Sequence, residues 1–188
     1  MLFAVHIPTR PKANVEARRL LKLALERRRY DVPAHCVLAF SHMLDAWSGW
    51  GEDVAASVRE AQRWAQEAVH FAPNDAWAQF TLGVASSTPK TLDQAKNRHI
   101  QALRLSPSLA VAIGDLGRIH VFSGDLEAGA NYADEALQLS PYDQQAGLWV
   151  RTKSIAAWMR GDLAEALDLV DYSLVIRPGW FQNHYLRA

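Results

Sequence analysis

A short motif that closes on proline four times constrains the fold of this chain more than any other feature. In the first three copies a small residue precedes two apolar residues that bracket a polar one, and in the fourth the bracketed residue is Val175. The motif ends at Pro73, Pro107, Pro141 and Pro178. The spacings between these prolines are 34, 34 and 37 residues. Because proline disfavours helical geometry in the residue before it and cannot continue the hydrogen-bond ladder, each motif marks the end of an amphipathic helix.

Each period also contains a break near its middle. The breaks fall at residues 86–90, 123–125 and 161–162, where Ser, Gly, Pro and Asp gather. After the first break, Thr91 and Gln94 have the spacing of a capping box that begins a second helix. Two helices per period form a hairpin, and stacked hairpins bury a continuous core that one hairpin cannot bury alone. The sequence therefore predicts an all-α solenoid.

The period, the Gly-Asp turns, the small residues and the closing proline together resemble the tetratricopeptide repeat (TPR). The resemblance implies a right-handed superhelix of helical hairpins, with small residues where paired helices approach most closely. In the first helices these positions fall on Gly83, Gly117 and Ser154. In the second helices they fall on Ala95, Gly129 and Ala166, and then on Ala102, Ala136 and Ser173.

The repeats predict one array without a separate second domain. Residues 1–13 form an N-terminal extension, and residues 14–188 form a single array with incomplete ends. Its predicted units are a partial repeat 14–32, an irregular repeat 33–73, three repeats 74–107, 108–141 and 142–178, and a partial repeat 179–188. Because a cut array exposes apolar faces that a further repeat would cover, a homodimer through the terminal helices is a further expectation.

Composition excludes several classes of protein. The 188 residues carry 20 Lys and Arg against 20 Asp and Glu, and 49% are hydrophobic, which argues against disorder and against a polybasic nucleic-acid binder. Residues 10–30 alone carry eight cations against two anions, an excess of +6. We expect this basic segment to form the solvated face of a terminal helix. We do not expect nucleic acid as a partner. Residues 1–7 are too short to span a membrane and lack a signal-peptide pattern, so we expect a cytoplasmic protein.

Enzymatic motifs are weak in this chain. His35 and His42 lie on one face of a predicted helix near Asp45, yet residues seven apart are not a chelating pair. Cys36, the single cysteine, adjoins His35, but adjacent helical residues point apart. No glycine-rich phosphate-binding loop occurs. We expect no catalytic residue, no cofactor, no metal and no small-molecule substrate.

A protein-binding groove is the strongest candidate site. In a stacked array the first helix of each hairpin lines the inner, concave face, where repeat proteins bind peptides. Aromatic residues and arginines are the usual anchors of such interfaces, and the register places six of them there. The predicted groove residues are Trp77, Phe80, Arg118, Phe122, Arg151 and Trp158. Packing of the same aromatic residues against the neighbouring hairpin is the alternative.

A narrower resemblance adds a second functional hypothesis. The Gly-Trp-Gly-Glu-Asp loop at 49–53, the Pro-Asn-Asp at 73–75 and the Pro-Gly-Trp at 178–180 are similar to repeat regions of bacterial class III adenylate cyclases and winged-helix transcriptional regulators. The leading expectation is a non-enzymatic scaffold that binds a protein segment or a regulatory domain along its concave face. The alternative is a detached sensory part of a cyclase or transcriptional regulator that acts by association.

Overall fold

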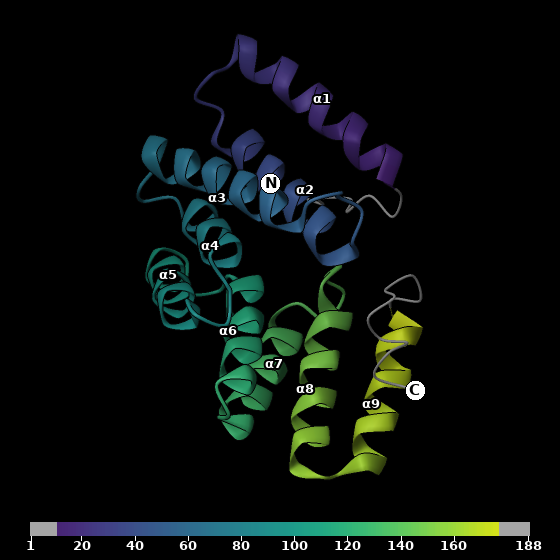
Figure 1. The fold of residues 1–188 in the computed structure, drawn as a ribbon. Helices are drawn as coiled ribbons and strands as arrows, with labels where there is room; N and C mark the ends of the chain where they lie inside the picture. The colour runs from purple at the N-terminus through teal and green to yellow at the C-terminus, as the bar shows by residue number, and fades with distance from the viewer. Residues whose placement is uncertain (1–10, 177–188) are drawn as a thin grey trace. The chain divides into compact units, whose positions relative to one another are not determined.

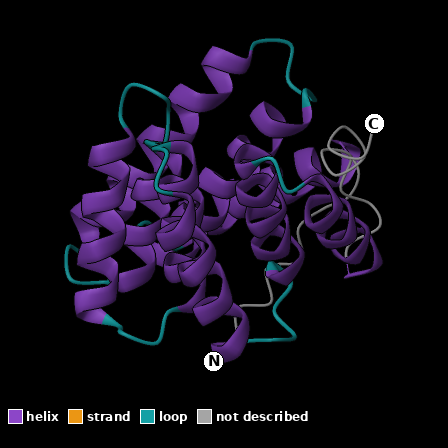
Figure 2. Ribbon diagram, turned by 90° about the horizontal axis from the view of Figure 1, so that it is seen from below, coloured by secondary structure: helices purple, strands orange, loops and turns teal. Residues whose placement is uncertain are grey.

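The computed structural model describes residues 11–176, and every regular element in that range is an α-helix (Figures 1 and 2). The helices are α1 (Pro11–Arg27), α2 (Val32–Ser48), α3 (Val54–Phe71), α4 (Ala76–Ala85), α5 (Leu92–Leu105), α6 (Ala110–Phe122), α7 (Leu126–Leu139), α8 (Ala146–Arg160) and α9 (Leu163–Ile176). The predicted all-helical solenoid fold is confirmed. The predicted partial repeat 179–188 lies outside the described residues.

Successive helices pair as hairpins: α2 with α3, α4 with α5, α6 with α7, and α8 with α9. The chain divides into two compact units, residues 1–105 and residues 106–188. The first unit contains α1 to α5, and the second contains α6 to α9. Each unit has its own packing and its own candidate surface, and each is described separately below.

Aspartate caps begin several of these helices. Asp31, Asp53, Asp75 and Asp125 each accept a hydrogen bond from the backbone N–H three residues later. This satisfies one of the amides that a helix start leaves without an intrahelical partner. Thr91 acts differently from its predicted role in a capping box. Its hydroxyl accepts from the Thr88 amide and donates to the Ser86 carbonyl, so it fixes the preceding loop.

A buried polar cluster attaches α1 to α2 in the first unit. The Asn14 side chain is fully buried, and its amide nitrogen donates to the Ser41 carbonyl at 2.9 Å and to Asp45 Oδ1 at 2.8 Å. Arg18 Nη1 lies 2.5 Å from Asp45 Oδ2. Leu21 and Leu25 pack against the core formed by α2 and α3. A carboxylate, an amide and a guanidinium thus satisfy one another where α1 meets the hairpin.

Small residues close the hairpins of the second unit at the predicted positions. A Cβ atom added to Gly117 of α6 would lie 2.7 Å from the Gly129 carbonyl oxygen of α7. In the next hairpin, the Ser154 hydroxyl donates to the Ala166 carbonyl at 2.7 Å. These two contacts confirm that Ser154 occupies the same position as Gly117 despite the longer final period.

The equivalent glycine of the first unit has a different neighbour. A Cβ atom on Gly83 of α4 would lie 2.5 Å from the His99 ring of α5, and His99 is fully buried. In the first unit the His99 imidazole therefore fills the space beside this glycine. In the second unit backbone atoms of Gly129 and Ala133 fill the corresponding space beside Gly117. Across α1 to α9, no helix is long and apolar enough to cross a membrane.

Candidate functional site

The first helices of neighbouring hairpins contact each other within each unit. In the first unit α2 contacts α4, and in the second unit α6 contacts α8. The predicted groove residues all lie on these first helices. Trp77 and Phe80 belong to α4 in the first unit, whereas Arg118, Phe122, Arg151 and Trp158 belong to α6 and α8 in the second.

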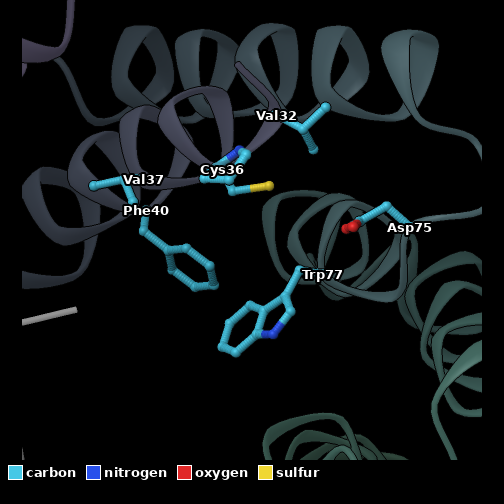
Figure 3. A pocket seen from close by; sticks show the side chains of 7 residues that line it. Val32, Cys36, Val37, Phe40, Asp75 and Trp77 are labelled. Atoms are coloured by element: carbon cyan, nitrogen blue, oxygen red, sulfur yellow. The ribbon is translucent and has the colours of Figure 1, made fainter. Parts of the chain in front are cut away.

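An apolar pocket lies between α2 and α4. It has a volume of about 60 Å³ and is lined by Val32, Pro33, Cys36, Val37, Phe40, Asp75 and Trp77 (Figure 3). Trp77 is the one predicted groove residue among them. The volume is far below the several hundred cubic ångströms of a typical small-molecule site, so the pocket suits one side chain of a partner.

Phe80 lies inside the first unit, with 1% of its surface exposed. Its ring meets Trp77 edge to face at 5.5 Å between centroids and lies 5.8 Å from Phe40 and 5.4 Å from His99. For Phe80 the structure therefore agrees with the alternative prediction, in which the aromatic ring packs against its neighbours. Its ring holds Trp77 and Phe40, two walls of the pocket, and is not itself presented to a partner.

The Cys36 thiol is an apolar wall of the pocket. Burial, with a smaller contribution from the negative charge of Asp75, raises the pKa of Cys36 to about 11. At neutral pH the side chain is a protonated thiol with 5% of its surface exposed. A thiol in this state is a poor nucleophile.

The second unit presents aromatic side chains at its surface. Phe122 at the end of α6 is 51% exposed, and Trp158 near the end of α8 is 59% exposed. Arg118 lies close to Phe122, with its guanidinium carbon 6.0 Å from the ring centre. Two hydrogen bonds to Asp115, at 2.6 and 3.0 Å, orient that guanidinium. Arg151 is partly buried on α8. We call Arg118, Phe122, Arg151 and Trp158 the aromatic patch.

Gly114 lets α6 and α8 approach each other closely within the second unit. A Cβ atom added there would collide with Nε1 of Trp149, a residue with 2% of its surface exposed. Trp149 is therefore a core residue that docks α8 on α6, whereas Trp158 on the same helix is at the surface. The two tryptophans differ in burial, and helical periodicity alone does not predict that difference.

His35 and Asp45 of α2 have polar partners within the first unit. His35 Nδ1 lies 2.8 Å from the Asp31 carbonyl oxygen, and its Nε2 lies 3.3 Å from Glu67. Asp45 binds Asn14 and Arg18. Burial, helped by the charge of Arg18, lowers the pKa of His42 to about 4. Within residues 11–176, no group of three or more His, Cys, Asp or Glu side chains could hold a metal ion.

The basic segment uses part of its charge internally. Arg18 pairs with buried Asp45, Arg19 pairs with Glu16 at 2.7 Å, and Arg28 lies 3.9 Å from Asp31. The Arg18 pair anchors α1, so at least one of these cations has a structural role.

Comparisons with known proteins place the fold. No protein-family model matches the chain, and no curated protein sequence matches it. Solved structures do match. TTC0263 of Thermus thermophilus, described as a thermophilic TPR protein, has 18% identity and a TM-score of 0.70, over 89% of this chain and 85% of that one.

Two further matches extend this likeness. PilF of Pseudomonas aeruginosa has 15% identity and a TM-score of 0.64, over 93% of this chain and 68% of that one. YrrB, described as a TPR protein with an unusual peptide-binding site, has 14% identity and a TM-score of 0.54, over 93% of this chain and 83% of that one. The narrower resemblance to cyclase-attached repeats is not shown by these comparisons and stays a prediction.

Proposed function

The chain has the tetratricopeptide-repeat fold, and on that premise we propose that it is a non-enzymatic scaffold that binds a protein segment or regulatory domain. Each unit has its own candidate binding surface on its first helices: the pocket in the first unit and the aromatic patch in the second. Many proteins of this fold act in this way, and YrrB is described as having a peptide-binding site.

The exposure of Trp158 and Phe122 carries the proposal. Both side chains lie on helices that contact each other, and more than half of each is exposed. Tryptophan and arginine dominate the binding energy of protein interfaces, because a large rigid side chain removes much apolar surface from water when a partner covers it. Arg118 stands beside Phe122 and adds a charged group to the same face.

A peptide selection tests the proposal. Peptides selected from a random library on the full chain are labelled, and their affinities are measured by fluorescence anisotropy. Replacing Trp158 and Phe122 together by Ser should weaken binding about tenfold or more, as expected for interface anchors. Circular dichroism verifies that the variant keeps its helical content.

The matched control is Tyr142→Ser, which removes an aromatic side chain that is 99% exposed in the loop between α7 and α8. This variant should bind the selected peptides as the original chain does. Equal binding by the Trp158 and Phe122 variant would overturn the proposal. Equal losses in both variants would overturn it as well, because binding would then depend on exposed aromatic residues in general.

A further inference from the structure

We propose that the pocket between α2 and α4 binds a lysine side chain of the partner, with the ammonium group at Asp75 and the alkyl stem along Phe40 and Trp77. The inference deepens the proposed function and rests on it, since it names the residue that the first unit would recognise. The pocket carries a carboxylate, whereas the aromatic patch carries two arginines, one of which pairs with Asp115.

The walls of the pocket suit an alkyl chain. Val32, Pro33, Val37 and the protonated thiol of Cys36 offer apolar contacts, and two aromatic rings complete the lining. Figure 3 shows the Phe40 and Trp77 rings directed into the space between α2 and α4. A lysine stem buries its methylene groups on such a surface while its charged end seeks a polar partner.

One negative charge stands at the edge of this apolar space. Asp75 Oδ1 accepts the Ala78 amide at 2.8 Å and so caps α4. Within residues 11–176, no Lys, Arg or His forms a salt bridge with Asp75. Figure 3 shows its carboxylate directed towards the Cys36 thiol. Asp75 itself lines the pocket, and its charge contributes to the raised pKa of that thiol.

A cation fits this arrangement better than the alternatives. A neutral apolar side chain would cover Asp75 and remove its hydration without replacing it, which is unfavourable. A glutamate would meet a like charge. An ammonium group gains the attraction of the carboxylate and of the aromatic ring faces. The N-terminus of α4 contributes roughly half a positive charge, so the full charge of Asp75 leaves the site negative.

The small volume favours lysine over arginine. A pocket of about 60 Å³ accepts a slim stem and a compact ammonium group more readily than a planar guanidinium. Arginine is therefore the comparison that tests shape, and norleucine, which has an alkyl chain without the ammonium group, is the comparison that tests charge.

The experiment uses the full chain and four acetylated, amidated pentapeptides with Gly at every position except the centre. The centre is Lys, Arg, norleucine or Glu. Titrations are followed by the NMR signal of the Trp77 indole N–H, assigned with a Trp77→Phe variant. The lysine peptide should bind about tenfold more tightly than the norleucine peptide, the scale of a partly desolvated charge and cation–π contact. The arginine peptide should bind more weakly than the lysine peptide, and the glutamate peptide should not bind.

Asp75→Asn is the decisive variant, because asparagine caps a helix as well as aspartate does and removes only the charge. It should weaken the lysine peptide about tenfold, and it should not weaken the norleucine peptide, whose binding no longer removes the hydration of a charge. Equal affinities for the lysine and norleucine peptides, no binding of either, or a preference for lysine that survives in Asp75→Asn would each overturn the inference. If library peptides still required Trp158 and Phe122, the proposed function would stand without it.

Discussion

The two units bury different kinds of polar side chain. The first unit buries the amide of Asn14, the carboxylate of Asp45 and the imidazoles of His35 and His99, together with other polar groups. The buried polar side chains of the described part of the second unit are the hydroxyls of Thr152, Ser154 and Ser173. Each of these hydroxyls donates to a backbone carbonyl, on Leu148, Ala166 and Gly147 respectively.

This difference separates two ways of holding neighbouring helices together. The second unit relies on small residues, so that backbone approaches backbone at Gly117 and Gly129. The first unit relies on larger polar and titratable groups that must find partners, as Asn14 and Asp45 do. We therefore expect the second unit to be sensitive to added volume, and the first unit to be sensitive to lost partners and to pH.

Gly117→Val should produce the largest loss of stability. Its side chain would collide with the Gly129 carbonyl and the Ala133 amide, which are backbone atoms of α7 and cannot move without displacing the helix. We expect a loss of about 3 kcal/mol in the free energy of unfolding, measured by urea denaturation. Hydrogen exchange should show the loss of protection in α6 and α7. Asn131→Val, on an exposed position of α7, is the control and should change little. An equal effect at both positions would refute the close-approach argument.

Asp45→Ala should come next, at about 2 kcal/mol. The substitution leaves the Asn14 amide and the Arg18 guanidinium without their carboxylate where α1 meets α2. Glu16→Ala removes an exposed carboxylate that pairs with Arg19 on α1 and is the matched control, with little expected effect. Faster exchange of the α1 amides in Asp45→Ala alone would support the attachment role. Equal behaviour of the two variants would contradict it.

The close-approach positions show how far a sequence pattern predicts structure. Ser154 and Ala166 are assigned from the repeat alone, and the hydrogen bond between them confirms both. The pattern does not predict that His99 fills the space beside Gly83. A histidine fits there because the glycine opposite has no side chain, and that pairing depends on three-dimensional contact between α4 and α5.

The pocket residues show which positions the repeat pattern does not predict. Trp77 belongs to a regular repeat and is assigned to the binding face from its register. Cys36 and Phe40 lie on α2, whose hairpin has a longer first helix than the others, so the repeat sets no register for them. Phe80 has the correct register but is buried, because Phe40, Trp77 and His99 surround its ring.

Gly83→Ala tests the contrast between the two glycines directly. Its added Cβ would meet the ring of His99, a side chain, instead of backbone. A ring can shift slightly, so we expect a loss of about 1 to 2 kcal/mol, smaller than for Gly117→Val. The same substitution made in a His99→Ala background should cost less, because the colliding ring is absent. Additive losses in the double-mutant cycle would show that the two residues do not interact.

His42 should make stability depend on pH. Burial, followed by the charge of Arg18, lowers the pKa of His42 to about 4 in the folded chain. Its unfolded pKa is about 6.5, so between these values the unfolded chain takes up the proton more readily. The contribution is fully present above about pH 6.5 and decreases as pH falls towards 4.

From about pH 7 to about pH 5.5, the original chain should lose about 1 kcal/mol more stability than His42→Gln. Lys22, Glu60 and Asp45 also influence this imidazole, and they are present in both proteins, so the difference isolates His42. Parallel pH profiles of the two proteins would exclude His42 as the source of the pH dependence.

Trp158→Ser should have the smallest effect on stability and a large effect on binding. Trp158 is 59% exposed, so its removal should change the free energy of unfolding by no more than about 0.5 kcal/mol. Trp77→Ser should cost about 1 to 2 kcal/mol, because that indole packs edge to face on buried Phe80. Each variant should weaken the library peptides that bind the unit to which the replaced tryptophan belongs. If Trp158→Ser destabilised the chain as much as Trp77→Ser, the aromatic patch would be a packing surface, and the second unit would resemble the first in how it uses its aromatic residues.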